Sequence, residues 1–74
     1  MNKRTANKVL AEVKATFGDE GQTLYDADHE GLSKGSFSIA WEGGPENWTY
    51  DFTTTVPGVF VEAMNHWSLA VYDA

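Results

Sequence analysis

Apolar and polar residues alternate with a period of two in the middle of the chain, which predicts two β-strands. The apolar positions are Phe37, Ile39 and Trp41 before a Gly-Gly-Pro-Glu turn at residues 43–46, and Trp48, Tyr50 and Phe52 after it. Because a four-residue turn sets the register, it places Phe37 opposite Phe52, Ile39 opposite Tyr50 and Trp41 opposite Trp48. The sequence therefore predicts a central hairpin over residues 36–55.

This register assigns each residue of the first strand to one face of the sheet. Ile39 faces a core and Ser38 faces away from it, because neighbouring side chains in a strand point to opposite sides. We therefore expect Ile39→Asp to unfold the domain and Ser38→Asp to cost little.

The N-terminal residues 2–17 show the period of an amphipathic helix. Its apolar face consists of Ala6, Val9, Leu10, Val13 and Phe17. Gly18 follows as a C-cap, since glycine adopts the backbone conformation that ends many helices. We expect this helix to cover the apolar side of the hairpin.

The segment at residues 59–72 fits two patterns. As a helix it would place on one face Phe60, Ala63, Met64, Trp67 and Val71; as two strands around a loop at residues 65–66 it would place on one face Val59, Val61, Ala63, Leu69 and Val71. β-branched residues favour the strands. The helical alternative would give the α-β-β-β-α order of a double-stranded RNA-binding domain, but the lysines that such a domain needs on its second helix are absent.

Together these elements predict one α+β domain over residues 1–74. An N-terminal helix packs on one face of a four- or five-stranded antiparallel sheet, with a further short strand at residues 22–27. Seventy-four residues suffice for one small core.

The net charge of −6 is unevenly distributed. Residues 1–14 hold four basic residues and one acidic residue, giving +3, whereas the remaining residues hold ten acidic residues and Lys34, giving −9. The acidic body argues against nucleic acid as a partner. The absence of cysteine, of a long apolar run and of a signal peptide leads us to expect a cytoplasmic protein with no membrane segment.

Candidate chemistry is sparse, and we expect neither an enzyme nor a cofactor. His29 and His66 lie far apart in sequence, each in an expected loop. Residues 26–31 (DADHEG) match the start of a calcium-binding loop, but Phe37 stands where that loop needs a bidentate glutamate. We therefore expect no catalytic residue and no metal site.

The expected binding residues are aromatic or lie in the turn. Trp41 and Trp48 flank the turn and would project beyond the helix, Glu46 lies in the turn itself, and Trp67 and Tyr72 belong to the last apolar segment. That segment has no lysine or proline to protect it as a sheet edge, so we expect it to be either central in the sheet or used in a contact with a host protein or a homodimer.

Three short strings resemble small proteins encoded by actinobacterial phages. They are residues 41–45 (WEGGP) followed by Trp48, residues 58–62 (GVFVE), and residues 67–72 (WSLAVY). Those proteins tend to have proline where this chain has Ala63, which favours a strand there because proline would interrupt a helix. No catalytic or binding residues are assigned in that family. The resemblance implies a phage accessory protein made in a bacterial host cell.

Two functions are compatible with this sequence. The first is a small acidic interaction protein that binds a host protein. The second is an acidic nucleic-acid mimic that blocks a DNA-binding host or defence enzyme, which would need carboxylates spaced like backbone phosphates, about 7 Å apart on one strand. A continuous acidic stripe would favour the mimic, and scattered acids would favour simple solubility.

Overall fold

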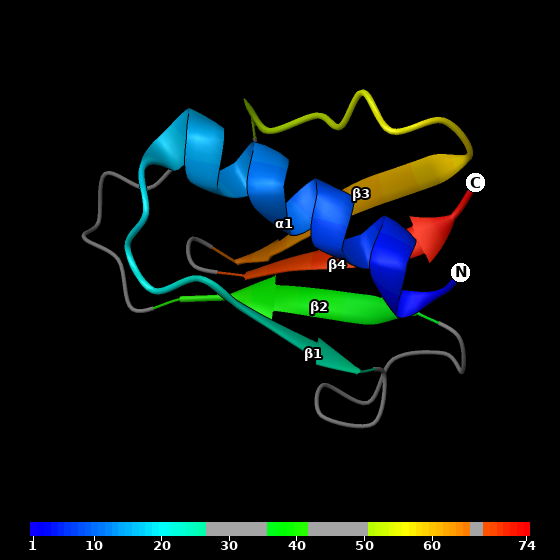
Figure 1. The fold of residues 1–74 in the computed structure, drawn as a ribbon, viewed down its shortest axis with the longest axis horizontal. Coiled ribbons are helices and arrows are strands. Elements are labelled where there is room, and N and C mark those ends of the chain that lie inside the picture. Colours follow the sequence, from blue (N-terminus) through cyan, green and yellow to red (C-terminus); the bar gives the residue numbers. More distant parts are fainter. Residues whose placement is uncertain (27–35, 42–50, 66–67) are drawn as a thin grey trace.

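One helix lies across one face of a four-stranded antiparallel sheet (Figure 1). The structure is a computed structural model that describes residues 1–26, 36–41, 51–65 and 68–74. The elements are α1 (Lys3–Phe17), β1 (Thr23–Asp26), β2 (Phe37–Ala40), β3 (Val59–Asn65) and β4 (Ser68–Asp73). The spatial order of the strands is β1-β2-β4-β3, and every neighbouring pair is antiparallel. The predicted α+β architecture is confirmed.

Helix α1 begins one residue later than its sequence predicts and ends at the predicted residue, Phe17. Asn2 is the N-cap, and its side chain accepts a hydrogen bond from the backbone N–H of Thr5 at 2.9 Å. Gly18 ends the helix with a φ of 88°, a conformation that favours glycine, and its N–H donates to the carbonyl oxygen of Lys14. Ala6 and Val9 are among the fully buried residues on the face toward the sheet.

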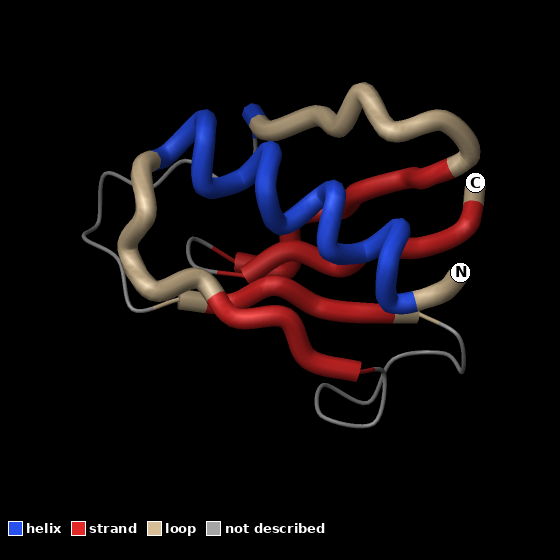
Figure 2. The backbone as a smooth tube through the Cα atoms, viewed as in Figure 1, coloured by secondary structure: helices blue, strands red, loops and turns tan. Residues whose placement is uncertain are grey.

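Figure 2 shows α1 lying across one face of the sheet, and the buried residues between the two form the core. Its buried members include Val9, Val13, Ile39, Leu69 and Val71. Burying an aliphatic side chain of this size contributes roughly 1.5 to 3 kcal/mol, so this single layer supplies most of the apolar stabilisation.

Residues 59–65 and 68–73 form the strands β3 and β4, which is the alternative that the β-branched residues favour. Val61 pairs with Val71 and Ala63 pairs with Leu69, and these four residues belong to the core beneath the helix. The helical alternative is wrong for this segment, and with it the order of a double-stranded RNA-binding domain.

The predicted central hairpin is wrong. Ile39 pairs with Leu24 on β1 and with Leu69 on β4, so both edges of its strand are occupied. Its predicted partner Tyr50 lies outside the described residues, and Phe52, which follows the predicted turn, lies outside any strand. The hydrophobic alternation identified the buried face of β2 correctly but not the strands beside it.

Three aromatic residues near the C-terminal end of α1 form a cluster instead of a strand pair. The Phe17 ring lies 5.6 Å from that of Trp41 and 5.9 Å from that of Phe52, measured between ring centroids. Phe52 is therefore buried by packing against the helix, while Phe37 pairs with Val71.

The centre of the sheet face opposite the helix is buried. Ser38 and Ala70 face each other across β2 and β4, and both are 0% exposed. The expectation that Ser38 tolerates aspartate because it lies on an open face is wrong, since a carboxylate there would be buried. Within the described residues, its hydroxyl oxygen has no hydrogen-bond partner.

Strand β4 lies between β2 and β3, so the last apolar segment is central in the sheet. Of the two alternatives for that segment, the structure shows the central position. The free edges of the described sheet belong to β1 and β3. A homodimer through the edge of the last strand therefore has no structural basis.

Candidate functional site

Two of the residues expected to bind a partner, Trp41 and Tyr72, lie among the described residues. Trp41 is 4% exposed and belongs to the core, so its side chain does not reach the surface. Glu46, Trp48 and Trp67 lie outside the described residues. Tyr72, near the end of β4, is half-buried on the sheet face opposite the helix.

Tyr72 is accompanied by a residue that the sequence did not single out. Phe60 pairs with Tyr72 across β3 and β4, and their rings stack with centroids 6.2 Å apart and planes inclined by 22°. Phe60 is 51% exposed, and within the described part of the chain it is the exposed large apolar side chain. The strand alternation carried the signal, because residues between Val59, Val61 and Ala63 must face away from the helix.

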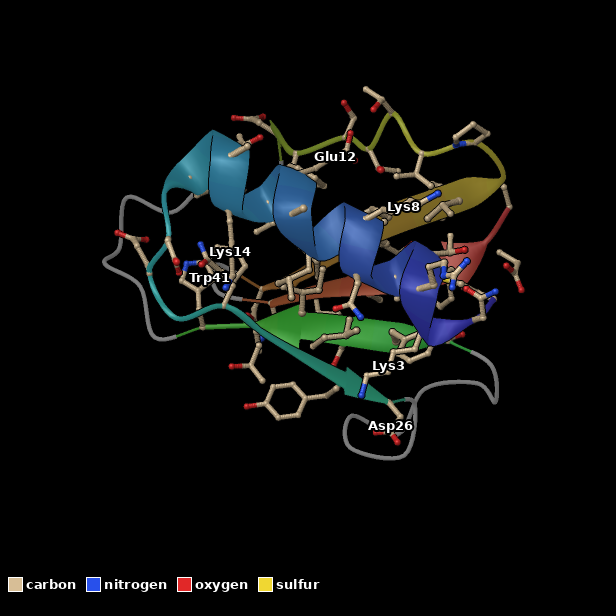
Figure 3. The ribbon with its side chains drawn as sticks, viewed as in Figure 1. Lys3, Lys8, Glu12, Lys14, Asp26 and Trp41 are labelled. Atoms are coloured by element: carbon tan, nitrogen blue, oxygen red, sulfur yellow. The ribbon has the colours of Figure 1, made fainter. Side chains whose placement is uncertain are left out.

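A segment that we call the strap, residues 51–58, leads into β3 and runs beside it (Figure 1). Glu12 of α1 points toward the strap (Figure 3) and holds it by its carboxylate. The hydroxyl groups of Thr54 and Thr55 donate to Glu12, and the backbone N–H of Thr55 donates to both carboxylate oxygens, at 3.2 and 3.1 Å. The strap is thus attached to the helix by a side chain.

This arrangement changes the acidity of Glu12. Partial burial raises the pKa of its carboxyl group, but the hydrogen bonds from Thr54 and Thr55 oppose that effect, and the pKa lies below its ordinary value of 4.5. Glu12 is therefore a carboxylate at neutral pH, which is the form that accepts all of these bonds.

Between the strap and β3 lies a cavity of about 150 Å³. It is lined by Thr53 and Thr54 on one side and by Val59, Phe60 and Val61 on the other. Among the described residues no backbone hydrogen bond joins the strap to β3. The edge of β3 therefore faces a small space rather than another strand.

The backbone groups that point into this space follow from the pairing with β4. The N–H of Ala74 donates to the carbonyl oxygen of Gly58, which makes these opposite residues a hydrogen-bonded pair. Because hydrogen-bonded and non-hydrogen-bonded pairs alternate in an antiparallel ladder, the backbone groups of Val59, Val61 and Ala63 point away from β4. Those of Phe60 and Glu62 point toward it.

The part of the chain that the structure describes contains no cluster of three metal-ligating side chains. His29 and His66 lie outside the described residues, as does all of the calcium-like run except Asp26, at the end of β1. A cavity of about 60 Å³ near Asp26 and Lys3 is too small for an ordinary ligand.

Several described acidic residues are engaged within the molecule. Asp73 lies 2.7 Å from the N-terminal amino group, Asp19 lies 3.5 Å from the ammonium group of Lys14, and Glu12 holds the strap. Four further acidic residues, Asp28, Glu30, Glu42 and Glu46, lie outside the described residues.

Comparisons with protein-family models, with curated proteins and with solved structures found no match to this chain. Among the described residues, no helix has the length and apolar character needed to cross a membrane.

Proposed function

We propose that this chain is a non-enzymatic interaction protein that binds another protein through the outer face of β3 and β4. In keeping with the phage resemblance, we place it in the cytoplasm of a bacterial host, as an accessory protein that binds a host protein. The observation that carries the proposal is the stacked pair of Phe60 and Tyr72, in which Phe60 is exposed on strand β3.

An exposed aromatic pair suits protein binding for two reasons. Aromatic side chains dominate the residues whose truncation weakens protein interfaces, because they bury a large area with few rotatable bonds. Stacking also fixes the ring of Phe60 before binding, which lowers the entropy cost of ordering it. Phe60 stands beside Glu62 on the same face, so the surface combines apolar area with a negative charge.

The test compares three immobilised proteins in capture from an actinobacterial lysate. We expect Phe60→Ala to reduce capture of a specific protein by tenfold or more, because the variant removes the centre of the contact. Tyr25→Ala, which truncates an aromatic residue on the opposite edge strand β1, is the matched control and should retain capture. Equal capture by all three proteins would contradict the proposal.

The nucleic-acid mimic is a second proposal that no described observation favours. Glu12, Asp19 and Asp73 are engaged within the molecule, so they do not form part of a free acidic stripe. A captured protein that DNA displaces from wild type and from Phe60→Ala alike would support the mimic in place of the aromatic surface.

A further inference from the structure

The longer free edge of the described sheet belongs to β3, whose pairing with β4 is regular from Val59 to Ala63 and shifts register only between Ala63 and Asn65. β3 has seven residues, against four in β1, and its sequence VFVEAMN contains no lysine and no proline. The outward backbone groups of Val59, Val61 and Ala63 lack ladder partners within the described residues. Such a row of groups is a template for another strand.

We infer that the edge of β3 accepts an extended segment of a partner protein as a fifth strand, antiparallel to β3, with a basic residue beside Glu62. This inference rests on the proposed function and specifies its partner. Strand addition obtains affinity from main-chain hydrogen bonds and specificity from alternate side chains. Here the main-chain bonds would join the partner to Val59, Val61 and Ala63.

The strap favours a single inserted strand over a second copy of this chain. A two-fold axis that pairs two β3 edges would keep both helices on one side of the joined sheet, and would therefore bring two straps to the same edge. The register centred on Glu62 would also place two carboxylates opposite each other, which is destabilising. A lone extended segment meets neither obstacle, and the cavity beside Val59 and Val61 is open to one of its side chains.

Charge selects the chemistry of that segment. Glu62 is the charged residue of β3, is exposed, and points to the face opposite the helix. The whole chain carries a net charge of −6, which attracts a basic partner. Across from Phe60 an aromatic or aliphatic residue fits best, since such cross-strand pairs stabilise sheets.

The probe is the synthetic peptide acetyl-Thr-Val-Lys-Val-Phe-Val-Thr-amide. Its valines pair with the outward residues of β3, its lysine stands opposite Glu62 and its phenylalanine opposite Phe60. We expect the peptide to slow amide hydrogen exchange at Val59, Val61 and Ala63 by at least threefold. Replacing its lysine by glutamate should weaken binding by roughly fivefold.

Two changes test the backbone contact directly. N-methylation of the central peptide valine removes a donor to Val61 and leaves the protein unchanged, so it should abolish the slowed exchange. Ala63→Pro removes an outward N–H while keeping the ladder to β4, as proline does at sheet edges, and Ala63→Ser is its control. We expect Ala63→Pro to weaken peptide binding by tenfold or more and Ala63→Ser to leave it unchanged.

The outcomes separate this inference from the proposed function. No change in exchange at the three outward amides, or equal binding of the N-methylated peptide, would overturn strand addition. Lysate capture that Phe60→Ala removes and Ala63→Pro preserves would leave the proposed function standing while overturning the inserted strand. Capture that neither variant affects would overturn both.

Discussion

A single carboxylate joins two parts of this chain that are far apart in sequence. Glu12 in α1 accepts hydrogen bonds from Thr54 and Thr55, 42 and 43 residues away. Nothing in the helical periodicity distinguishes Glu12 from other polar residues of α1, because its role depends on where the strap passes. This contact also gives the protein a specific dependence on pH.

We expect stability to fall in acid through Glu12. Since the pKa of Glu12 is lower in the folded protein than its ordinary value of 4.5, its stabilisation is fully present above about pH 4.5 and is lost as the pH falls through the lowered value. Glu12→Gln should cost about 1 kcal/mol at pH 7, as loss of a partly exposed hydrogen-bonded group does. Urea unfolding at pH 7 and pH 3 measures both effects.

The matched control is Glu62→Gln, which removes the same charge from an exposed strand position. It should change the free energy of unfolding by less than about 0.5 kcal/mol at pH 7. If Glu12→Gln and Glu62→Gln were equally stable at pH 7, the carboxylate of Glu12 would not be what holds the strap.

Strand β3 has a backbone that alternates between two environments, and we expect hydrogen exchange in the free protein to report it. The amides of Phe60 and Glu62 point toward β4 and should exchange at least ~10-fold more slowly than those of Val59 and Val61, which point to the free edge. Exchange followed residue by residue by NMR gives the rates. Uniform protection along β3 would mean that its outer edge is already paired.

The sequence predicts the individual helix and strands better than it predicts which strands pair with each other. The helical period of the apolar residues predicts α1, and the alternation of apolar residues predicts β3 and β4. Both patterns are local, because they depend on which face of the element is buried and on a short connection. Partner choice for β2 is a property of the whole fold: Ile39 pairs with Leu69, thirty positions later, and no alternation pattern within residues 36–55 encodes that distance. The alternation within residues 36–55 therefore predicts the wrong partner for Ile39.

The candidate site shows the same division. The alternation that puts Val61 on the core side also puts Phe60 on the outer side, so the exposed aromatic pair could have been found from the sequence once strands were chosen. The burial of Trp41 could not have been predicted from the sequence, because it depends on contact with the ring of Phe17 at the end of the helix. Ser38 likewise alternates as a surface residue, yet the folded sheet encloses it completely.

At the scale of the whole molecule, the two ends of the chain meet. The N-terminal amino group lies 2.7 Å from a carboxylate oxygen of Asp73, beside the end of the central strand β4 (Figure 1). The last strand is thus enclosed by neighbours on both edges. The apolar sequence of β4, which is compatible with an edge strand that pairs with another chain, belongs instead to a central strand of the sheet.

We therefore expect the isolated protein to be a monomer. The apolar strand β4 is internal, self-pairing of β3 centred on Glu62 opposes like charges, and a net charge of −6 adds repulsion between copies. Sedimentation equilibrium at micromolar concentration should give a mass of 8.2 kDa. A dimer that persists at low salt would contradict this expectation. If Ala63→Pro abolished that dimer, the contact would lie at the edge of β3, and a second copy of the chain would occupy the edge in place of the basic segment.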